Sequence, residues 1–470
     1  MTRFAVAFLS GLYLASSCAD VRRPATTHTP ARDAGIMLDT AFADASSIDA
    51  SDAHDAQVLV DSGEALALGC EPSSGTPAAR TVSDLGVGGM VTCVVYADGR
   101  AACVGVNTEG QLGDGVAGHQ SCPSASDCSL SAVRVATLER ASAIDVGSSS
   151  CAIEDGAVRC WGLGAQGELG DGVANHERCG SFECSRTPVL VSGISNAREI
   201  EVSDYGHSCA LLESGEVVCW GSNADSQLGD GRDQHEACEW ANGTECSRTP
   251  VKVSGLSDAI ELSVGGFHSC ARRARGGVVC WGHNVFGQLG DGTRQDRNLP
   301  VEVPGLSDAV EVEAGYSHTC ARRVSGEVVC WGWNSYAQLG RPPAGTGCDG
   351  YPCETAPVTV NGLSDVIDLS SRHTHTCALG RSGRVSCWGD GQQGELGDGE
   401  AAHETCGSTD CSPTPVQVLG LDDVVEVRAA AFSTCARRRS CEVWCWGMNH
   451  GHLGDGTTEQ RRAPVKATAF

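Results

Sequence analysis

Cysteine dominates the reactive chemistry of this chain, since 27 of its 470 residues are cysteines. Cysteines can form disulfides, bind zinc or act as nucleophiles. Spacing sorts most of them into short-range pairs. Seven pairs are nine or ten residues apart, namely Cys93 with Cys103, Cys151 with Cys160, Cys209 with Cys219, Cys270 with Cys280, Cys320 with Cys330, Cys377 with Cys387 and Cys435 with Cys445. Five more are five to eight residues apart, namely Cys122 with Cys128, Cys179 with Cys184, Cys238 with Cys246, Cys348 with Cys353 and Cys406 with Cys411. Cys18, Cys70 and Cys441 remain.

The seven longer-spaced pairs each frame a predicted β-hairpin. Residues opposite each other on antiparallel strands bring their Cβ atoms about 4.5–5.5 Å apart, close to the range that a disulfide needs. So many cysteines are typical of an exported protein, in which disulfides persist. We therefore predict disulfides in these hairpins, with buried free thiols as the alternative.

The five other pairs lie in insertions that follow a Leu-Gly turn. Four insertions carry a histidine three residues before their first cysteine, namely His119, His176, His235 and His403. Zinc binding is therefore one interpretation, but each loop offers only three ligands, and a structural zinc site usually has four. We expect disulfides that give each loop a fixed shape, and no metal or other cofactor.

The N-terminal residues 1–18 predict an export signal. Arg3 supplies a positive charge, and the apolar run 4–15 is too short to span a membrane. The run ends in Ser16-Ser17-Cys18, which resembles a bacterial lipobox and makes Cys18 a candidate lipidation site. Cleavage near Ser17 without lipidation is the alternative. Residues 19–69 are rich in Ala, Asp, Ser and Thr, and we expect a disordered acidic tether.

Residues 70–470 form the predicted folded domain, and they repeat one unit seven times. The first cysteine of each hairpin recurs every 50–61 residues, a period that suits one four-stranded propeller blade. In the clearest copy the expected strands are 250–253, 259–264, 268–272 and 278–281. We predict an all-β, seven-bladed β-propeller of four-stranded blades.

The two ends of the repeat region suggest how the ring closes. The first copy has no clear Pro-Val strand before it, and the chain ends in an extra one at 464–467. We therefore expect the C-terminal strand to pair into the first blade and close the ring, which removes exposed sheet edges. Cys70 and Cys441 could then meet across the closure.

These copies resemble the regulator-of-chromosome-condensation repeat family. Its units pair a Gly-x-x-His-(Ser/Thr)-x-Ala strand with a Val-x-x-Trp-Gly-x-Asn-x-x-Gly-Gln-Leu-Gly strand and turn. Here 265–271 with 278–290, 315–321 with 328–340 and 206–210 with 217–229 match it. Two departures are Val104 in place of Trp and Arg341 where six copies have Asp. The resemblance covers about residues 80–470 and implies a seven-bladed propeller.

The resemblance implies less about activity. The family's namesake is a chromatin-bound nucleotide-exchange factor for a nuclear GTPase, and that activity needs a basic arm. This chain has an acidic arm, so we expect the fold to transfer without the exchange activity. Bacterial relatives include an exported inhibitor that binds β-lactamases, which shows that the scaffold can serve protein binding alone.

Several side chains are candidates for structural or binding roles. Arginines gather at the tips of the later hairpins, and we consider Arg272, Arg273, Arg322, Arg323, Arg437 and Arg438 candidate ligand-binding residues, with solvated loop tips as the alternative. Histidines stand two residues before a hairpin cysteine at His207, His268, His318 and His375, where we expect hydrogen bonds between blades rather than a metal site. We expect a core position between blades for Trp161, Trp220, Trp281, Trp331, Trp388 and Trp446.

Charge and motifs limit the function. A formal net charge of −26 disfavours nucleic acid and anionic membranes as partners. No catalytic constellation or phosphate loop is present in the sequence, so we predict a binding protein with no catalytic residues. We expect an exported, lipid-anchored scaffold at the outer membrane or cell surface, whose insertion loops bind an unidentified protein or surface ligand. The alternatives are exchange-factor activity by family analogy and a propeller enzyme that acts on polysaccharide.

Overall fold

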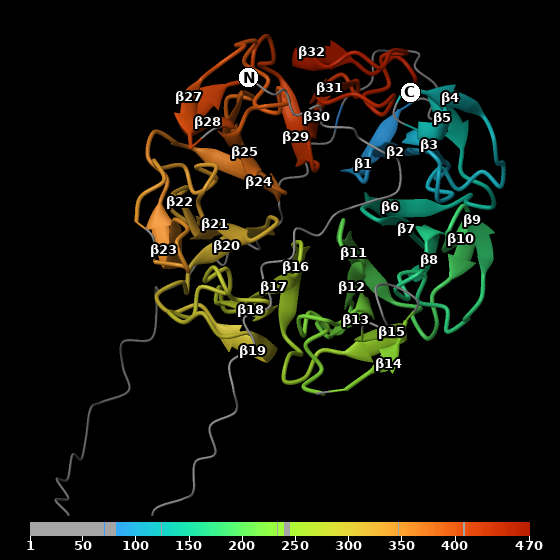
Figure 1. Ribbon diagram of the computed structural model, residues 1–470, viewed down its shortest axis with the longest axis horizontal. Helices are drawn as coiled ribbons and strands as arrows, with labels where there is room; N and C mark the ends of the chain where they lie inside the picture. The colour runs from blue at the N-terminus through green and yellow to red at the C-terminus, as the bar shows by residue number, and fades with distance from the viewer. Residues whose placement is uncertain are drawn as a thin grey trace, which may run out of the picture. The chain divides into compact units, whose positions relative to one another are not determined.

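Seven antiparallel sheets surround one axis and form a seven-bladed β-propeller (Figure 1). This computed structural model describes Cys70 and residues 81–123, 125–232, 234–238, 245–345, 347–407 and 409–470. All of them belong to the second of two compact units of the chain, Ala65–Phe470. The expected export signal at 1–18, its Cys18 and the tether at 19–69 lie outside the described residues. Within the described ranges, no helix is long and apolar enough to cross a membrane.

The strands of each blade run outward from the axis in chain order, except that in blades 1, 2, 3 and 6 the short rim strand precedes its inner neighbour in the sequence (Figure 1). Blades 1 to 3 are β1 (Val82–Gly88), β2 (Val91–Tyr96), β3 (Ala101–Val106), β5 (Ala125–Arg134) and β4 (Gln120–Cys122); β6 (Ala141–Val146), β7 (Ser149–Glu154), β8 (Ala157–Leu163), β10 (Phe182–Leu190) and β9 (Glu177–Cys179); and β11 (Ala197–Val202), β12 (His207–Leu212), β13 (Val217–Ser222), β15 (Glu245–Lys252) and β14 (Glu236–Ala237). Blades 4 and 5 are β16 (Ala259–Val264), β17 (His268–Arg273), β18 (Val278–Gly282) and β19 (Arg297–Glu302); and β20 (Ala309–Ala314), β21 (His318–Arg323), β22 (Val328–Trp333) and β23 (Cys353–Thr359). Blades 6 and 7 are β24 (Val366–Arg372), β25 (His375–Gly380), β26 (Val385–Asp390), β28 (Thr409–Gln417) and β27 (Glu404–Cys406); and β29 (Val424–Ala429), β30 (Ser433–Arg438), β31 (Val443–Gly447) and β32 (Arg461–Lys466).

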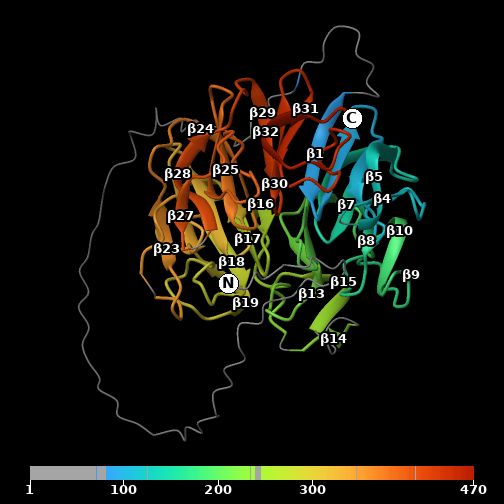
Figure 2. The same cartoon turned by 45° about the horizontal axis from the view of Figure 1, so that its top comes forward.

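The all-β, seven-bladed fold is confirmed, and the number of strands differs from the prediction in four blades. Blades 1, 2, 3 and 6 each have a fifth strand at the rim, formed by their insertion. These short rim strands, β4, β9, β14 and β27, are visible at the edge of the ring in Figure 2. In these four blades the insertion therefore adds a strand to the sheet as well as forming a surface loop.

The predicted ring closure is wrong. The C-terminal strand β32 pairs with β31 of its own blade, where Val465 lies opposite Cys445. Each Pro-Val strand is likewise the outer strand of the blade that precedes it, so 250–253 belongs to blade 3. The period of a repeat does not fix where its structural unit begins, and the sequence pattern placed this boundary one strand too early.

The ring closes by packing of whole blades against each other. Strand β1 lies beside β29 and β30 (Figure 1), and one apolar cluster joins Leu85 and Val94 of blade 1 to Val443 and Leu453 of blade 7. Cys70, which precedes blade 1, is joined to Cys441 in the last hairpin. A disulfide thus takes the place of an exchanged strand at the closure.

The alternation of side chains along each strand gives every blade two different faces. In blade 4, Cys270 lies opposite Cys280, and Ser269 lies opposite Trp281 on the other side of the sheet. The cysteine face of each blade packs on the tryptophan face of the next, so Trp281 packs with Cys209 and Cys219. The six core tryptophans are buried between blades, as predicted, and are less than 2% exposed.

The tryptophans also make a directional bond between neighbouring blades. The indole Nε1 of Trp281 donates to the main-chain carbonyl of Gln227 in the preceding blade at 2.9 Å. The same bond is made by Trp161, Trp220, Trp331, Trp388 and Trp446. The accepting residue precedes a Leu-Gly turn, and a Cβ at Gly290 would lie 2.6 Å from Trp331 Nε1, at a φ of +71°. Glycine is therefore required where the turn contacts the indole.

The four histidines bridge blades, as expected. His268 Nε2 lies 2.9 Å from Thr319 Oγ1 of the next blade, and His207, His318 and His375 contact Ser269, Thr376 and Thr434 in the same way. Thr319 Oγ1 in turn donates to the carbonyl of Gln288, the same oxygen that Trp331 uses. Ser269 and Thr434 donate to the turns of their own interfaces in the same way, whereas Thr376 contacts Ser371 of its own blade. Three of these interfaces therefore join a histidine, a hydroxyl and an indole to one turn.

The inner strands are joined by acidic side chains. Carboxylates of one blade accept main-chain N–H groups of the next. Ile144 donates to Asp84, Val312 to Glu261 and Leu369 to Glu311, each at 2.8 Å. Burial raises the pKa of Glu199 to about 8, with a further rise from the charge of Glu261. Burial also raises the pKa of Glu313 to about 8, although Arg428 lowers it in part.

These buried groups predict an optimum of stability in mildly acidic solution. Glu199 and Glu313 bind protons more tightly when folded, so their stabilising contribution is present below pH 4.5 and is lost as pH rises toward 8. Burial lowers the pKa of His207 and His318 to about 3, so their contribution is present above pH 6.5 and is lost as pH falls. Between pH 6.5 and 8 the carboxylic acids therefore determine how the free energy of unfolding changes with pH.

We expect the melting temperature to fall by at least several degrees between pH 6.5 and 8, measured by calorimetry. The double variant Glu199→Gln with Glu313→Gln should flatten this fall and raise the melting temperature at pH 8, because a neutral amide costs less to bury. Glu213→Gln, at an exposed position, serves as the control and should keep the native profile. An unchanged slope in the double variant would contradict the explanation.

Candidate binding surface

Two kinds of turn lie on one face of the ring because neighbouring strands run antiparallel. These are the turns between the first and second strands of a blade and the connections from the third strand to the rim, which include all five insertions. We call this side the loop face. The opposite side carries the turns between the second and third strands, and we call it the hairpin face.

The structure brings together every cysteine pair of the hairpins. The two Cα atoms of each pair are 4.0–4.1 Å apart, and each disulfide lies within its own sheet. This arrangement supports disulfides over buried free thiols at these positions. The seven disulfides join Cys93 with Cys103, Cys151 with Cys160, Cys209 with Cys219, Cys270 with Cys280, Cys320 with Cys330, Cys377 with Cys387 and Cys435 with Cys445.

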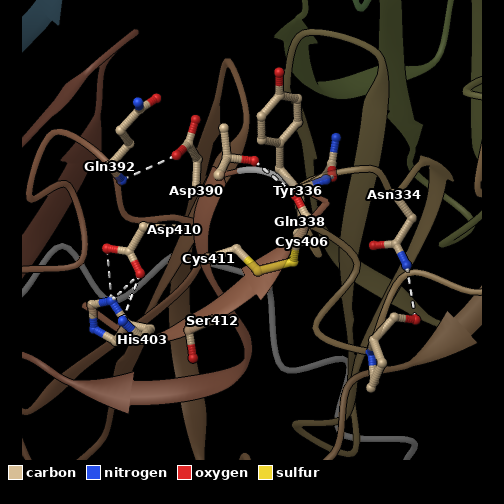
Figure 3. Close-up of a disulfide and its surroundings, with 12 residues drawn as sticks. Asn334, Tyr336, Gln338, Asp390, Gln392, His403, Cys406, Asp410, Cys411 and Ser412 are labelled. Atoms are coloured by element: carbon tan, nitrogen blue, oxygen red, sulfur yellow. Dashed lines mark hydrogen bonds and ion pairs between the residues drawn. A yellow bond between two sulfur atoms is a disulfide. The ribbon is translucent and has the colours of Figure 1, made fainter. Parts of the chain in front are cut away.

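The five insertion pairs are joined as well, with Cα atoms 5.8–6.1 Å apart. The disulfide of blade 6 packs on Ala337 of blade 5, beside the turn that holds Tyr336 and Gln338 (Figure 3). Each insertion is thus a covalently closed loop. These five disulfides join Cys122 with Cys128, Cys179 with Cys184, Cys238 with Cys246, Cys348 with Cys353 and Cys406 with Cys411.

The insertion histidines bind carboxylates. His403 contacts Asp398 of the Leu-Gly-Asp-Gly turn at 2.8 Å and Asp410 at 3.2 Å, the latter visible in Figure 3. His119, His176 and His235 bind Asp114, Asp171 and Asp230 in the same way. Blades 4 and 7 lack such a histidine, and Arg297 and Arg461 bind the corresponding Asp291 and Asp455. No group of three or more possible metal ligands occurs in the described part of the chain.

The candidate ligand-binding arginines do not form an open basic surface. Arg272, Arg322 and Arg437 lie directly across the sheet from Glu261, Glu311 and Glu426 and are paired with them. Arg273, Arg323 and Arg438 are paired with Asp258, Asp308 and Asp423. Sequence alone missed this because each acid precedes its arginine by 11 or 15 residues on a neighbouring strand or turn. These arginines stabilise their own blades.

The loop face carries a surface of aromatic side chains that the sequence did not reveal. We call it the aromatic strip, and it consists of Tyr205, Phe267, His283, Phe286, Tyr316, Trp333, Tyr336 and Tyr351. Neighbouring ring centroids are 4.9 Å apart for Tyr205–Phe267, 5.3 Å for Phe267–Tyr316, 6.1 Å for Tyr316–Trp333 and 5.5 Å for Phe286–Trp333. Seven of these residues are partly exposed, and Tyr351 is the most exposed of the eight at 49%. The sequence signal that could have revealed the strip is the occurrence of aromatic residues at positions of the repeat that vary between its seven copies.

Beneath the strip, one arginine closes the loop-face end of the central channel. Arg372 of blade 6 reaches across the axis to Asp204 of blade 3 at 3.0 Å and to the carbonyl of Val146 in blade 2 at 2.9 Å. Asp204 also accepts the main-chain N–H of Gly89 in blade 1 at 3.1 Å. Below these groups a cavity of about 40 Å³ remains, lined in part by Glu201, Glu313 and Arg428. The strip is therefore a surface over a plugged channel.

The fold and this site define a seven-bladed propeller of the type in which a Trp-Gly strand bonds the preceding Leu-Gly turn. Residues 59–405 match the RCC1-like domain, and residues 382–437 match the Regulator of chromosome condensation (RCC1) repeat. This chain belongs to the RCC1-like domain family.

Relatives share the propeller within proteins of different length. The chain is 28% identical over 322 residues to the human E3 ubiquitin-protein ligase HERC2, which is 67% of this chain but only 6% of that protein. It is 27% identical over 319 residues to the RCC1 domain-containing protein RUG3, mitochondrial, of Arabidopsis thaliana, covering 63% of this chain and 55% of that one.

Solved structures show the same fold. Human WBSCR16 superposes with a TM-score of 0.64 at 20% identity, covering 79% of this chain and 94% of that one. Yeast RCC1 (Prp20), solved bound to Kap60, gives 0.63 at 19% identity, covering 85% and 89%. At these identities the structures show a shared architecture.

The histidine contacts predict that the insertion of blade 6 loosens as pH rises. Burial lowers the pKa of His403, but its hydrogen bonds to Asp398 and Asp410 outweigh burial and raise the pKa above 6.5. The contact is therefore complete below pH 6.5 and is lost as pH rises through the raised value. Hydrogen exchange in residues 399–411, corrected for intrinsic rates, should become faster at pH 8 than at pH 6.

His403→Gln should give fast exchange at both pH values, because the charged contact is absent. The insertion of blade 5, closed by Cys348–Cys353, has no such histidine and provides the internal control. Equal protection of residues 399–411 at both pH values in the native protein would contradict the role given to His403.

Proposed function

We propose that this protein is an exported, lipid-anchored scaffold whose loop face binds a protein or cell-surface ligand. The aromatic strip carries this proposal, because contiguous and partly exposed aromatic rings on the surface of a folded domain are typical of binding surfaces. Five disulfide-closed insertions lie on the same face, and Tyr351 belongs to the one closed by Cys348–Cys353. A rigid ring that holds these loops at fixed spacing loses little conformational entropy on binding.

Export and anchoring rest on separate observations. The described residues contain 13 cysteine pairs, a number that suits an oxidising compartment. Cys18 follows an apolar run with small residues before it, as lipid attachment would require. We place the protein at the cell envelope for these reasons.

One relative supports a protein partner. The yeast RCC1 structure is a complex with Kap60, so a protein that has this propeller fold binds another protein. The match to HERC2 covers 6% of that ligase, and we propose no ligase activity for this chain.

Lipid attachment predicts a clear difference between the native chain and Cys18→Ser. We expect radiolabelled palmitate in the native protein and its recovery with the membrane fraction. Cys18→Ser should carry no label and should move to the soluble fraction, while a Cys70→Ser control should stay labelled. Label that persists in Cys18→Ser would contradict the anchor.

Loop-face binding predicts that the aromatic strip is needed for capture of a ligand. Full-length protein in detergent should retain a partner from a cell-surface extract, and the double variant Phe267→Ala with Trp333→Ala should reduce the retained amount about tenfold. Val324→Ala is the matched control, because Val324 is an apolar side chain on the hairpin face with 73% exposure. Equal capture by both variants would contradict binding at the loop face.

A further inference from the structure

The aromatic strip has carboxylates at both ends. At one end, Asp225 lies close enough to both His283 and Asp296 for their charges to interact, and Asp296 accepts the main-chain N–H of Asn284 at 2.6 Å. The ring of His283 is 6.0 Å from that of Phe267. Burial and then the charge of Asp296 raise the pKa of Asp225, although His283 lowers it in part. At the other end, burial and then the charge of Asp390 raise the pKa of Tyr336. Negative potential therefore extends over the strip from two sides.

The cations nearby are already paired. Arg294 binds Asp349 at 2.8 Å, Arg297 binds Asp291 at 2.8 Å and Arg341 binds Glu354 at 3.2 Å. Within the described ranges, neither Asp225 nor Asp296 forms an ion pair with an arginine or lysine. The chain as a whole has a formal net charge of −26, so no surrounding excess of positive charge offsets these groups.

Aromatic rings and carboxylates together select one class of ligand. The face of an aromatic ring carries partial negative charge and attracts a guanidinium or ammonium group within about 6 Å of its centroid. An anionic ligand would be repelled by the carboxylates at both ends, whereas a cation is attracted by the ring faces and by these carboxylates. Successive ring centroids from Phe267 to Tyr351 are 5.3–6.1 Å apart, so the strip is longer than one side chain.

We propose that the aromatic strip binds an extended protein segment that carries several arginine or lysine side chains. The ring faces of Phe267, Tyr316 and Trp333 hold the cationic groups, and Asp225 with Asp296 fixes one end of the segment. This inference rests on the proposed function of the loop face and names the chemistry of its ligand.

The test uses the full-length protein in detergent and calorimetric titration with three peptides and a sugar. The probes are octaarginine, octalysine, octaglutamate and cellohexaose. Octaarginine and octalysine should bind, more weakly at about 300 mM than at about 50 mM salt, and the other two should not. Trp333→Ala and Phe286→Ala leave the charge unchanged and should each weaken octaarginine about tenfold. Two separate ring variants guard against a folding defect in one of them.

A matched pair of charge variants separates a site from general attraction to an acidic protein. The double variant Asp225→Asn with Asp296→Asn should weaken octaarginine about fivefold. The double variant Asp365→Asn with Asp422→Asn removes the same charge from exposed positions on the hairpin face and should change the affinity less than about twofold.

Equal effects of the two charge variants, with no effect of the ring variants, would overturn the proposal in favour of non-specific attraction. Binding of cellohexaose instead of the cationic peptides would overturn it in favour of a glycan ligand. Self-association of the protein in sedimentation, lost in the ring variants, would overturn it in favour of a second copy of this chain. A further outcome separates this inference from the proposed function. The double variant Phe267→Ala with Trp333→Ala loses partner capture, while Trp333→Ala and Phe286→Ala each keep the native affinity for octaarginine. That outcome would support binding at the loop face and overturn the cationic ligand.

Discussion

The hydrogen bond from a tryptophan indole to a carbonyl of the preceding blade sets the spacing of this ring. It occurs at six of the seven blade interfaces, and each time the acceptor stands just before a Leu-Gly turn. The turn must approach the indole so closely that only glycine fits, as at Gly290. One short sequence motif therefore determines both the local turn and the distance to the next blade.

The seventh interface lacks this bond, and other interactions replace it. Val104 occupies the tryptophan position in blade 1, and His452 occupies the acceptor position in blade 7, where it binds Ser433 of its own blade. Apolar packing of blade 1 on blade 7 and the Cys70–Cys441 disulfide join the ring there. A covalent bond at the closure reduces the freedom of the unfolded chain, which compensates for a weaker contact.

The rigidity of this frame bears on the loop face. Arg372 ties blade 6 to blades 2 and 3 across the axis, so the turns above it are held from below as well as from the sides. Tyr205 and His373 each follow a residue of this network in the sequence. A binding surface built on such turns is preorganised, and its affinity then depends on the rings and charges that it presents.

The sequence by itself determined the repeat, the number of blades, the paired cysteines and the core position of the tryptophans. These follow from contacts within about ten residues and from a motif that is spelled out in nearly every copy. The tertiary structure decided where each blade begins, because a period has no intrinsic start, and it paired Arg272 with Glu261 rather than with a ligand. It alone assembled the aromatic strip and the Arg372 contacts, because these join turns that are from about 20 to more than 200 residues apart and meet only when the blades have folded and packed together.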